Sequence, residues 1–286
     1  MFVIIGWVAA LACIFGAYII HGGNIGVILH ALPTEMMAIL GGALGAFVVA
    51  NPPKVLKATM GGLGACFKGS KYTKERYLEL LALLYAILQK ARKDGLMAIE
   101  GEVEDPENST LFQTYPTIAG DHHVVEFMTD YLRLMMGGNL NPHEVESLMD
   151  SEIESHHQEA HLPANAVAKV AGSLPAFGIV AAVLGVVNTM GSVGQPPEIL
   201  GAMIGSALVG TFLGILLAYA IAEPIAGLME HLSNEGSKEL HCIKTTLLAS
   251  MQGYPPQVAV EFGRKVLFST ERPTFSELED RVKGRT

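Results

Sequence analysis

Lysine and arginine are absent from two long parts of this sequence. Of the 19 in the chain, none comes before Lys54 and none lies between Lys169 and Lys238. In membrane proteins, basic residues collect in the loops on the cytoplasmic side. The absence therefore predicts that residues 54–169 and both termini are cytoplasmic, and that the short connections near residues 21–35 and 191–198 face outward.

The sequence also lacks the motifs of common enzymes and metal sites. Its three cysteines, Cys13, Cys66 and Cys242, are far apart and form no CxxC pair, so no disulfide framework or zinc knuckle is implied. No phosphate-binding loop, dinucleotide fingerprint or nucleophile elbow occurs. The net charge of −9 argues against nucleic acid as the main partner. We expect a protein that is not an enzyme and needs no cofactor.

Long apolar runs are what the sequence does contain. Residues 170–222 carry one formal charge, Glu198, and the run is interrupted by the turn residues at 194–197. Because a membrane span needs about 20 apolar residues, this run predicts a hairpin of two transmembrane helices. Two more transmembrane helices are predicted, one over residues 2–20 and one from about Leu32 to residue 50. The fold class is therefore all-α, a polytopic membrane protein with four transmembrane helices and a helical cytoplasmic domain.

The remaining residues show amphipathic patterns that predict cytoplasmic helices. We place domain boundaries at residues 1–50, 51–169, 170–222 and 223–286. Capping residues and breakers predict a helix that begins near Pro142, ends near His161 and is followed by a break at Pro163. The other predicted segments are helices over 77–99, 124–136, 223–251, 257–268 and 275–282, and an acidic loop over 101–108.

Small residues recur along both helices of the predicted hairpin. They are Pro175, Gly178, Ala182, Gly185 and Thr189 on the first helix, and Ala207, Thr211, Gly214 and Ala218 on the second. Such stripes either let two helices pack closely or line a shared surface. Glu35, Glu198 and Glu223 fall at the ends of the predicted spans. A proton path normally requires an ionisable group within the membrane, so we expect a partner to supply it.

One cluster of histidines could suggest a membrane metalloenzyme. His157 and His161 are four residues apart beside His156, but Gln158 stands where a zincin motif requires glutamate. A solvated polar helix face is the favoured interpretation, and no metal site is predicted.

Four segments resemble the MotA family of flagellar motor stator subunits. They are SKYTKERYLELLALL (70–84), SLPAFGIVAAVLGVV (173–187), VGTFLGILLAY (209–219) and VEFGRKVLFSTERPTFSELE (260–279). The resemblance implies a multi-pass protein of the bacterial inner membrane, in lipid. It implies a ring of five copies around two copies of MotB, which would supply the ion-carrying aspartate and the peptidoglycan anchor. Ion flow would then drive torque on the rotor protein FliG. A TolQ- or ExbB-type energising subunit is the alternative, although such relatives are expected to have three spans.

The same resemblance assigns roles to individual residues. Arg92 and Glu100 match the charged pair that contacts the rotor, and we add Lys90 as part of an attractive charge field. Pro175 and Pro224 match the prolines that couple ion passage to movement. Thr211 matches the hydroxyl that lines the ion path, with Ala182 and Tyr219 beside it. Sodium-driven relatives carry threonine at the position of Ala182. Because a desolvated Na⁺ needs several oxygen ligands, H⁺ is the predicted coupling ion.

Overall fold

The computed structural model describes residues 2–138 and 141–284, and the chain is 84% helical. No strand occurs in the described ranges. The chain divides into two compact units. Unit 1 consists of residues 1–69 and 160–231, and unit 2 of residues 70–159 and 232–286. The division differs from the four segments expected from the sequence, because residues 51–69 and 160–169 join the unit that holds the apolar helices.

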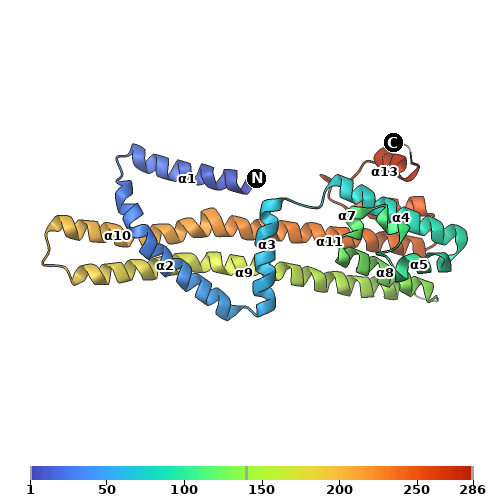
Figure 1. Cartoon of the computed structure of the whole chain (residues 1–286), viewed down its shortest axis with the longest axis horizontal. Helices are drawn as coiled ribbons and strands as arrows, with labels where there is room; N and C mark the ends of the chain where they lie inside the picture. Colours follow the sequence, from blue (N-terminus) through green and yellow to red (C-terminus); the bar gives the residue numbers. More distant parts are fainter. Residues whose placement is uncertain (1, 139–140, 285–286) are drawn as a thin grey trace. The chain divides into compact units, whose positions relative to one another are not determined.

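Four described helices are long and apolar enough to cross a membrane, and they lie wholly or partly in unit 1. Two belong to a hairpin, in which α9 (Pro142–Met190) is followed by α10 (Pro197–Leu216). The hairpin, α1 (Phe2–Ile20) and α2 (Ile25–Ala50) are visible in Figure 1, where α2 crosses the hairpin. The remaining elements are α3 (Pro53–Lys68), the segment η2 (Leu217–Ala222) and the start of α11 (Glu223–Met251). The four predicted transmembrane helices are confirmed.

The second apolar helix begins earlier than predicted. The side chain of Asn24 caps α2 by accepting a hydrogen bond from the backbone N–H of Gly26 (2.9 Å). The helix therefore begins seven residues before the predicted start at about Leu32, and Pro33 lies inside it. Glu35 is therefore an interior residue of α2, and its predicted place at the end of a span is wrong.

The predicted break at Pro163 is also wrong, because α9 continues through both Pro163 and Pro175. A proline inside a helix costs about 3 kcal/mol or more through its lost hydrogen bond and its clash with the preceding turn. Pro163 and the following Ala164 are buried. Packing on this segment offsets the local cost, since helices in proteins owe most of their stability to tertiary contacts.

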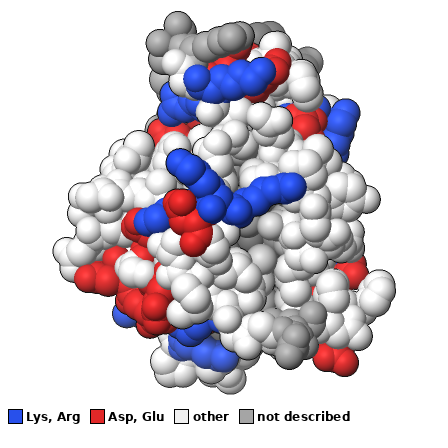
Figure 2. Space-filling view, turned by 90° about the vertical axis from the view of Figure 1, so that its right-hand side faces the viewer, with Lys and Arg blue, Asp and Glu red and all other residues white. Residues whose placement is uncertain are grey.

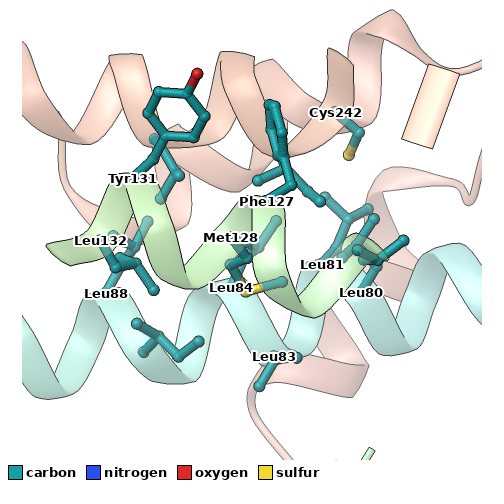
Figure 3. Packing of buried hydrophobic residues seen from close by; sticks show 14 of the residues in the cluster. Leu80, Leu81, Leu83, Leu84, Leu88, Phe127, Met128, Tyr131, Leu132 and Cys242 are labelled. Carbon is teal, nitrogen blue, oxygen red and sulfur yellow. The ribbon is translucent and has the colours of Figure 1, made fainter. Parts of the chain in front are cut away.

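Unit 2 is built on an apolar core between α4 (Lys74–Asp94), α8 (His122–Met136) and the end of α11. Figure 3 shows Leu84 and Leu88 of α4 beside Met128 and Leu132 of α8, while Phe127 and Tyr131 point away from α4 toward the side on which Cys242 lies. Around this core lie η1 (Leu96–Ile99), α5 (Glu100–Glu104), α6 (Thr110–Gln113), α7 (Pro116–Ala119), α12 (Pro256–Val266) and α13 (Phe275–Val282).

The ends of these helices follow local chemistry. The bounds of α13 and its capping box are confirmed, because Thr274 Oγ1 accepts from the N–H of Glu277 and Glu277 Oε2 accepts from the N–H of Thr274. The predicted helix over 77–99 is too long, since α4 ends before Gly95, whose φ is +91°. The predicted acidic loop is partly helical, because α5 occupies its first residues.

A buried ion network joins α4 to α11 within unit 2. Arg76 Nε donates to Glu239 Oε1 (2.7 Å) and Arg76 Nη2 donates to Asp121 Oδ2 (2.8 Å). Arg76 Nη1 also donates to the carbonyl oxygen of Thr117 (2.7 Å). Burial acts to raise the pKa of Asp121, but Lys71 and Arg76 outweigh this effect and hold that pKa below its ordinary value. Burial raises the pKa of Glu239 above its ordinary value, although the hydrogen bonds from Arg76 act to lower it.

Candidate functional site

The small residues of the hairpin bring the backbones of α9 and α10 into direct contact. A methyl group at Gly178 would lie 2.8 Å from the carbonyl oxygen of Gly210 and 3.1 Å from Cα of Gly214. One at Gly185 would lie 3.1 Å from Cα of Ala207. These members of both predicted stripes therefore pack the hairpin together, as small residues do between membrane helices.

Thr211 and Ala182 lie at one level of the hairpin, next to this contact. Their chain neighbours Gly210 and Ala181 face each other, because a methyl group at Gly210 would lie 3.3 Å from Cβ of Ala181. Both Thr211 and Ala182 are half-buried in the single chain. The Thr211 hydroxyl makes no hydrogen bond to any residue in the described ranges, whereas Thr189 donates to the carbonyl oxygen of Gly185 (2.9 Å). Thr211 thus retains a hydroxyl that can serve an ion or a partner.

The two prolines assigned to coupling occupy different local structures. Pro175 lies inside α9 and is half-buried. Pro224 follows η2, a π-helical segment that contains Tyr219. A proline clashes with the carbonyl of the residue four positions earlier, here Ala220, and a π-helical turn relieves this clash. Tyr219 projects from the segment with 68% of its surface exposed.

Glu35 is a polar residue of this region that the sequence interpretation placed at the end of a span, whereas it lies inside α2. Its Oε2 is buried and has no hydrogen-bond partner in the described structure. It lies so close to Gly210 that a side chain there would collide with it. An ionisable group inside a membrane segment is a functional candidate by default. Recognition of Asn24 as the N-cap of α2 would have placed Glu35 inside the span.

The three residues assigned to the rotor contact do not share one environment. Arg92 is exposed in the last turn of α4, and Glu100 is the exposed first residue of α5. Lys90 Nζ instead donates to Glu102 Oε1 (2.7 Å). The pKa of Glu102 is lowered, chiefly by its hydrogen bonds from Lys90 and Ser109. Among the described residues, Arg92 and Glu100 have no such partner, so Lys90 is the least available of the three.

Of the histidine cluster, His156 and His157 lie in unit 2, whereas His161 lies in unit 1. His157 Nδ1 lies 2.8 Å from Ser237 Oγ, and the ring centroids of His156 and His123 are 6.0 Å apart. Within residues 2–138 and 141–284, no three His, Cys, Asp or Glu side chains are gathered as metal ligands. Neither contact supports the metalloenzyme alternative.

Comparison with protein families matches the chain in two parts. Residues 4–95 match the model for the motility protein A N-terminal region, and residues 121–241 match the model for the MotA/TolQ/ExbB proton channel family. Together the two matches include the apolar helices and the candidate residues described above except Glu100, which lies between the two matched ranges.

Individual proteins are similar over almost the full chain. Motility protein A of Escherichia coli strain K12 is 47% identical over 284 residues, which cover 99% of this chain and 96% of that protein. Chemotaxis protein LafT of Vibrio parahaemolyticus is 37% identical over 275 residues, with 96% of each chain covered.

Two solved stator structures share the fold. The C. jejuni MotAB structure aligns with a TM-score of 0.77 and 23% identity, covering 95% of this chain and 98% of that one. The MotAB stator complex from Bacillus subtilis aligns with a TM-score of 0.70 and 24% identity, covering 99% and 98%.

Proposed function

Because the chain belongs to the motility protein A family of MotA/TolQ/ExbB proton channel proteins, we infer that it is a flagellar motor stator subunit that forms an ion channel with MotB. The observation that carries this inference is the 47% identity to E. coli motility protein A over nearly the whole chain. The protein is a multi-pass protein of the bacterial inner membrane. It converts ion flow into motor torque. The family to which it belongs is a channel family and not an enzyme family.

In the assembly, copies of this chain form a ring around MotB. We propose five copies of this chain around two copies of MotB. Support comes from the hairpin, where the half-buried Thr211 retains an unbonded hydroxyl beside Ala182. The membrane helices also expose many large apolar side chains, as expected for surfaces that face lipid or neighbouring subunits. MotB supplies the ion-carrying aspartate and the peptidoglycan anchor. Thr211, Ala182 and Tyr219 line the ion path next to that aspartate.

Pro175 and Pro224 act as the coupling prolines in this proposal. Protonation of the MotB aspartate changes packing near Thr211, and the proline-modified segments convert this change into a tilt of the helices below them. The π-helical η2 supports such a role for Pro224, because π-helical turns are frequent at functional sites and, like prolines, are places where helices kink. One charge that crosses 100 mV releases about 2.3 kcal/mol, which is enough to repack one helix end.

Both termini are cytoplasmic in the proposed orientation. A cysteine introduced at Asn24 or Gly194 is expected to react with an impermeant maleimide added to intact spheroplasts, because both residues lie at turns opposite the basic regions. A cysteine at Lys68 serves as the cytoplasmic control and should react only after the membrane is opened. If the cysteine at Lys68 reacts in intact spheroplasts and the cysteine at Gly194 does not, the proposed orientation is wrong.

The coupling ion is H⁺. Rotation at a fixed membrane potential is therefore expected to keep its speed when external Na⁺ is replaced by K⁺. The physical reason is the single hydroxyl at this level of the hairpin, since Ala182 offers no lone pair to complete a Na⁺ site beside Thr211. Collapse of the proton potential with a protonophore is the positive control and should stop the motor.

A different outcome of the same measurement would identify Na⁺ as the coupling ion. Loss of torque in K⁺ that returns in proportion to added Na⁺ contradicts the H⁺ assignment. In that case Ala182→Thr should change the Na⁺ dependence little, because other oxygen atoms would already complete the site.

Arg92 and Glu100 contact the rotor protein FliG in this proposal. Both are exposed and have no ion-pair partner in the described ranges, so they can enter a complementary charge field. Lys90 contributes less than the sequence suggests, because its ammonium group is held by Glu102.

A further inference from the structure

An open groove of about 400 Å³ lies in unit 2 beside the end of α4. Its floor includes Leu88, Ile99 and Leu132, which belong to the apolar core of the unit. The groove is therefore continuous with the core, and a side chain that entered it would meet well-packed apolar atoms. Burial of such a side chain is favourable because it removes apolar surface from water.

The walls of the groove are apolar and partly exposed. Leu96 and Tyr254 line it with 40% and 43% of their surfaces exposed. Met135 and Met251 also line it, and methionine side chains adapt to differently shaped partners. Unit 2 lies outside the predicted spans, so lipid does not explain these apolar residues. An apolar concave patch on such a unit is typical of an interaction site.

Arg92 is the one charged residue among the described residues that line the groove. Its guanidinium group has no ion-pair partner among the described residues, and it stands with Lys93 in the last turn of α4. Figure 2 shows the end of unit 2 on which α4 terminates, with Lys and Arg atoms near the centre of the face. The complement to this groove is therefore an apolar side chain with a carboxylate close beside it.

The open form of the groove favours a protein over a small molecule. Small-molecule sites usually enclose most of the ligand surface, whereas this groove is open to solvent. An amphipathic helix that places an aliphatic anchor in a groove and an acidic residue at its edge fits the arrangement well.

We propose that this groove takes an aliphatic side chain of the rotor protein, next to a rotor carboxylate that pairs with Arg92. The proposal rests on the proposed stator function and adds an apolar anchor to its charge contact. The charge pair steers and orients the encounter, and the apolar anchor slows dissociation.

The test measures binding of purified rotor protein to the full complex with MotB in lipid nanodiscs over a series of salt concentrations. Leu96→Gln is expected to weaken binding about tenfold at every salt concentration, because it replaces a groove wall with an amide. Leu96→Met keeps the volume and should bind like the wild type. Leu134→Gln is the matched control, since Leu134 is 39% exposed in the same unit and does not line the groove.

Arg92→Ala separates the two contributions. It should weaken binding at low salt and flatten the salt dependence, because screening acts on the charge contact alone. If Arg92→Ala has this effect while Leu96→Gln binds like the wild type, the groove proposal is wrong and the rotor contact stands. Equal losses in Leu96→Gln and Leu134→Gln also overturn the groove. Absence of binding by the wild type, or binding insensitive to both salt and Arg92→Ala, overturns the rotor contact itself.

Discussion

Replacement of Gly178 by leucine is expected to abolish motility and assembly of the stator complex. A methyl group at Gly178 would lie 2.8 Å from the carbonyl oxygen of Gly210, and one at Gly214 would lie 2.7 Å from the carbonyl oxygen of Leu174. Because the obstructing atoms belong to the backbone, no side-chain rotation relieves the collision. Overpacking typically costs about 1–3 kcal/mol, and we expect Gly178→Leu and Gly214→Leu to lie at or above the upper limit.

The same two helices provide matched controls. Gly172 on α9 and Gly201 on α10 have open space where a side chain would begin. Gly172→Leu and Gly201→Leu should therefore leave the hairpin intact. The measurement is the amount of assembled complex recovered by size-exclusion chromatography, together with swimming speed. Normal assembly of Gly178→Leu, or equal losses in all four variants, contradicts the close backbone contact.

Removal of the buried arginine in unit 2 is the second large effect that we expect. Arg76→Met leaves Glu239, only 1% exposed, without its cationic partner. Loss of one member of a buried ion pair costs about 3–5 kcal/mol, because the remaining charge stays desolvated. The thermal unfolding midpoint of the purified complex should fall accordingly. Its expression should fall as well.

Arg133→Met is the control for this prediction. Arg133 also pairs with two carboxylates, Glu104 and Asp130, but its side chain is 46% exposed. Exposed pairs contribute little because water and salt screen them, so this variant should unfold near the wild-type midpoint. The double variant Arg76→Met with Glu239→Met should recover part of the loss, since it removes the stranded charge. A midpoint for Arg76→Met equal to that of Arg133→Met contradicts the buried network.

Local chemistry was sufficient to predict the fold class of this protein. Four apolar runs had the length that a membrane requires, and residues 194–197 separated the hairpin helices because prolines and glycine favour a turn. The capping box at Thr274 located α13 to the residue, since its hydrogen bonds involve neighbours in the sequence. The functional roles of Thr211, Ala182, Tyr219, Pro175 and Pro224 stay predictions that rest on the family resemblance.

Tertiary packing decided what local signals could not. Sequence spacing predicted stripes of small residues, but only the packed hairpin shows that Gly178 meets Gly214 while Thr211 keeps a hydroxyl with no partner in the described ranges. Lys90 and Arg92 look alike in sequence, yet the fold brings Glu102 to Lys90 and leaves Arg92 at an apolar groove. The physical reason is that pairing and burial depend on residues far apart in the chain, whereas propensities and caps act within one or two helical turns.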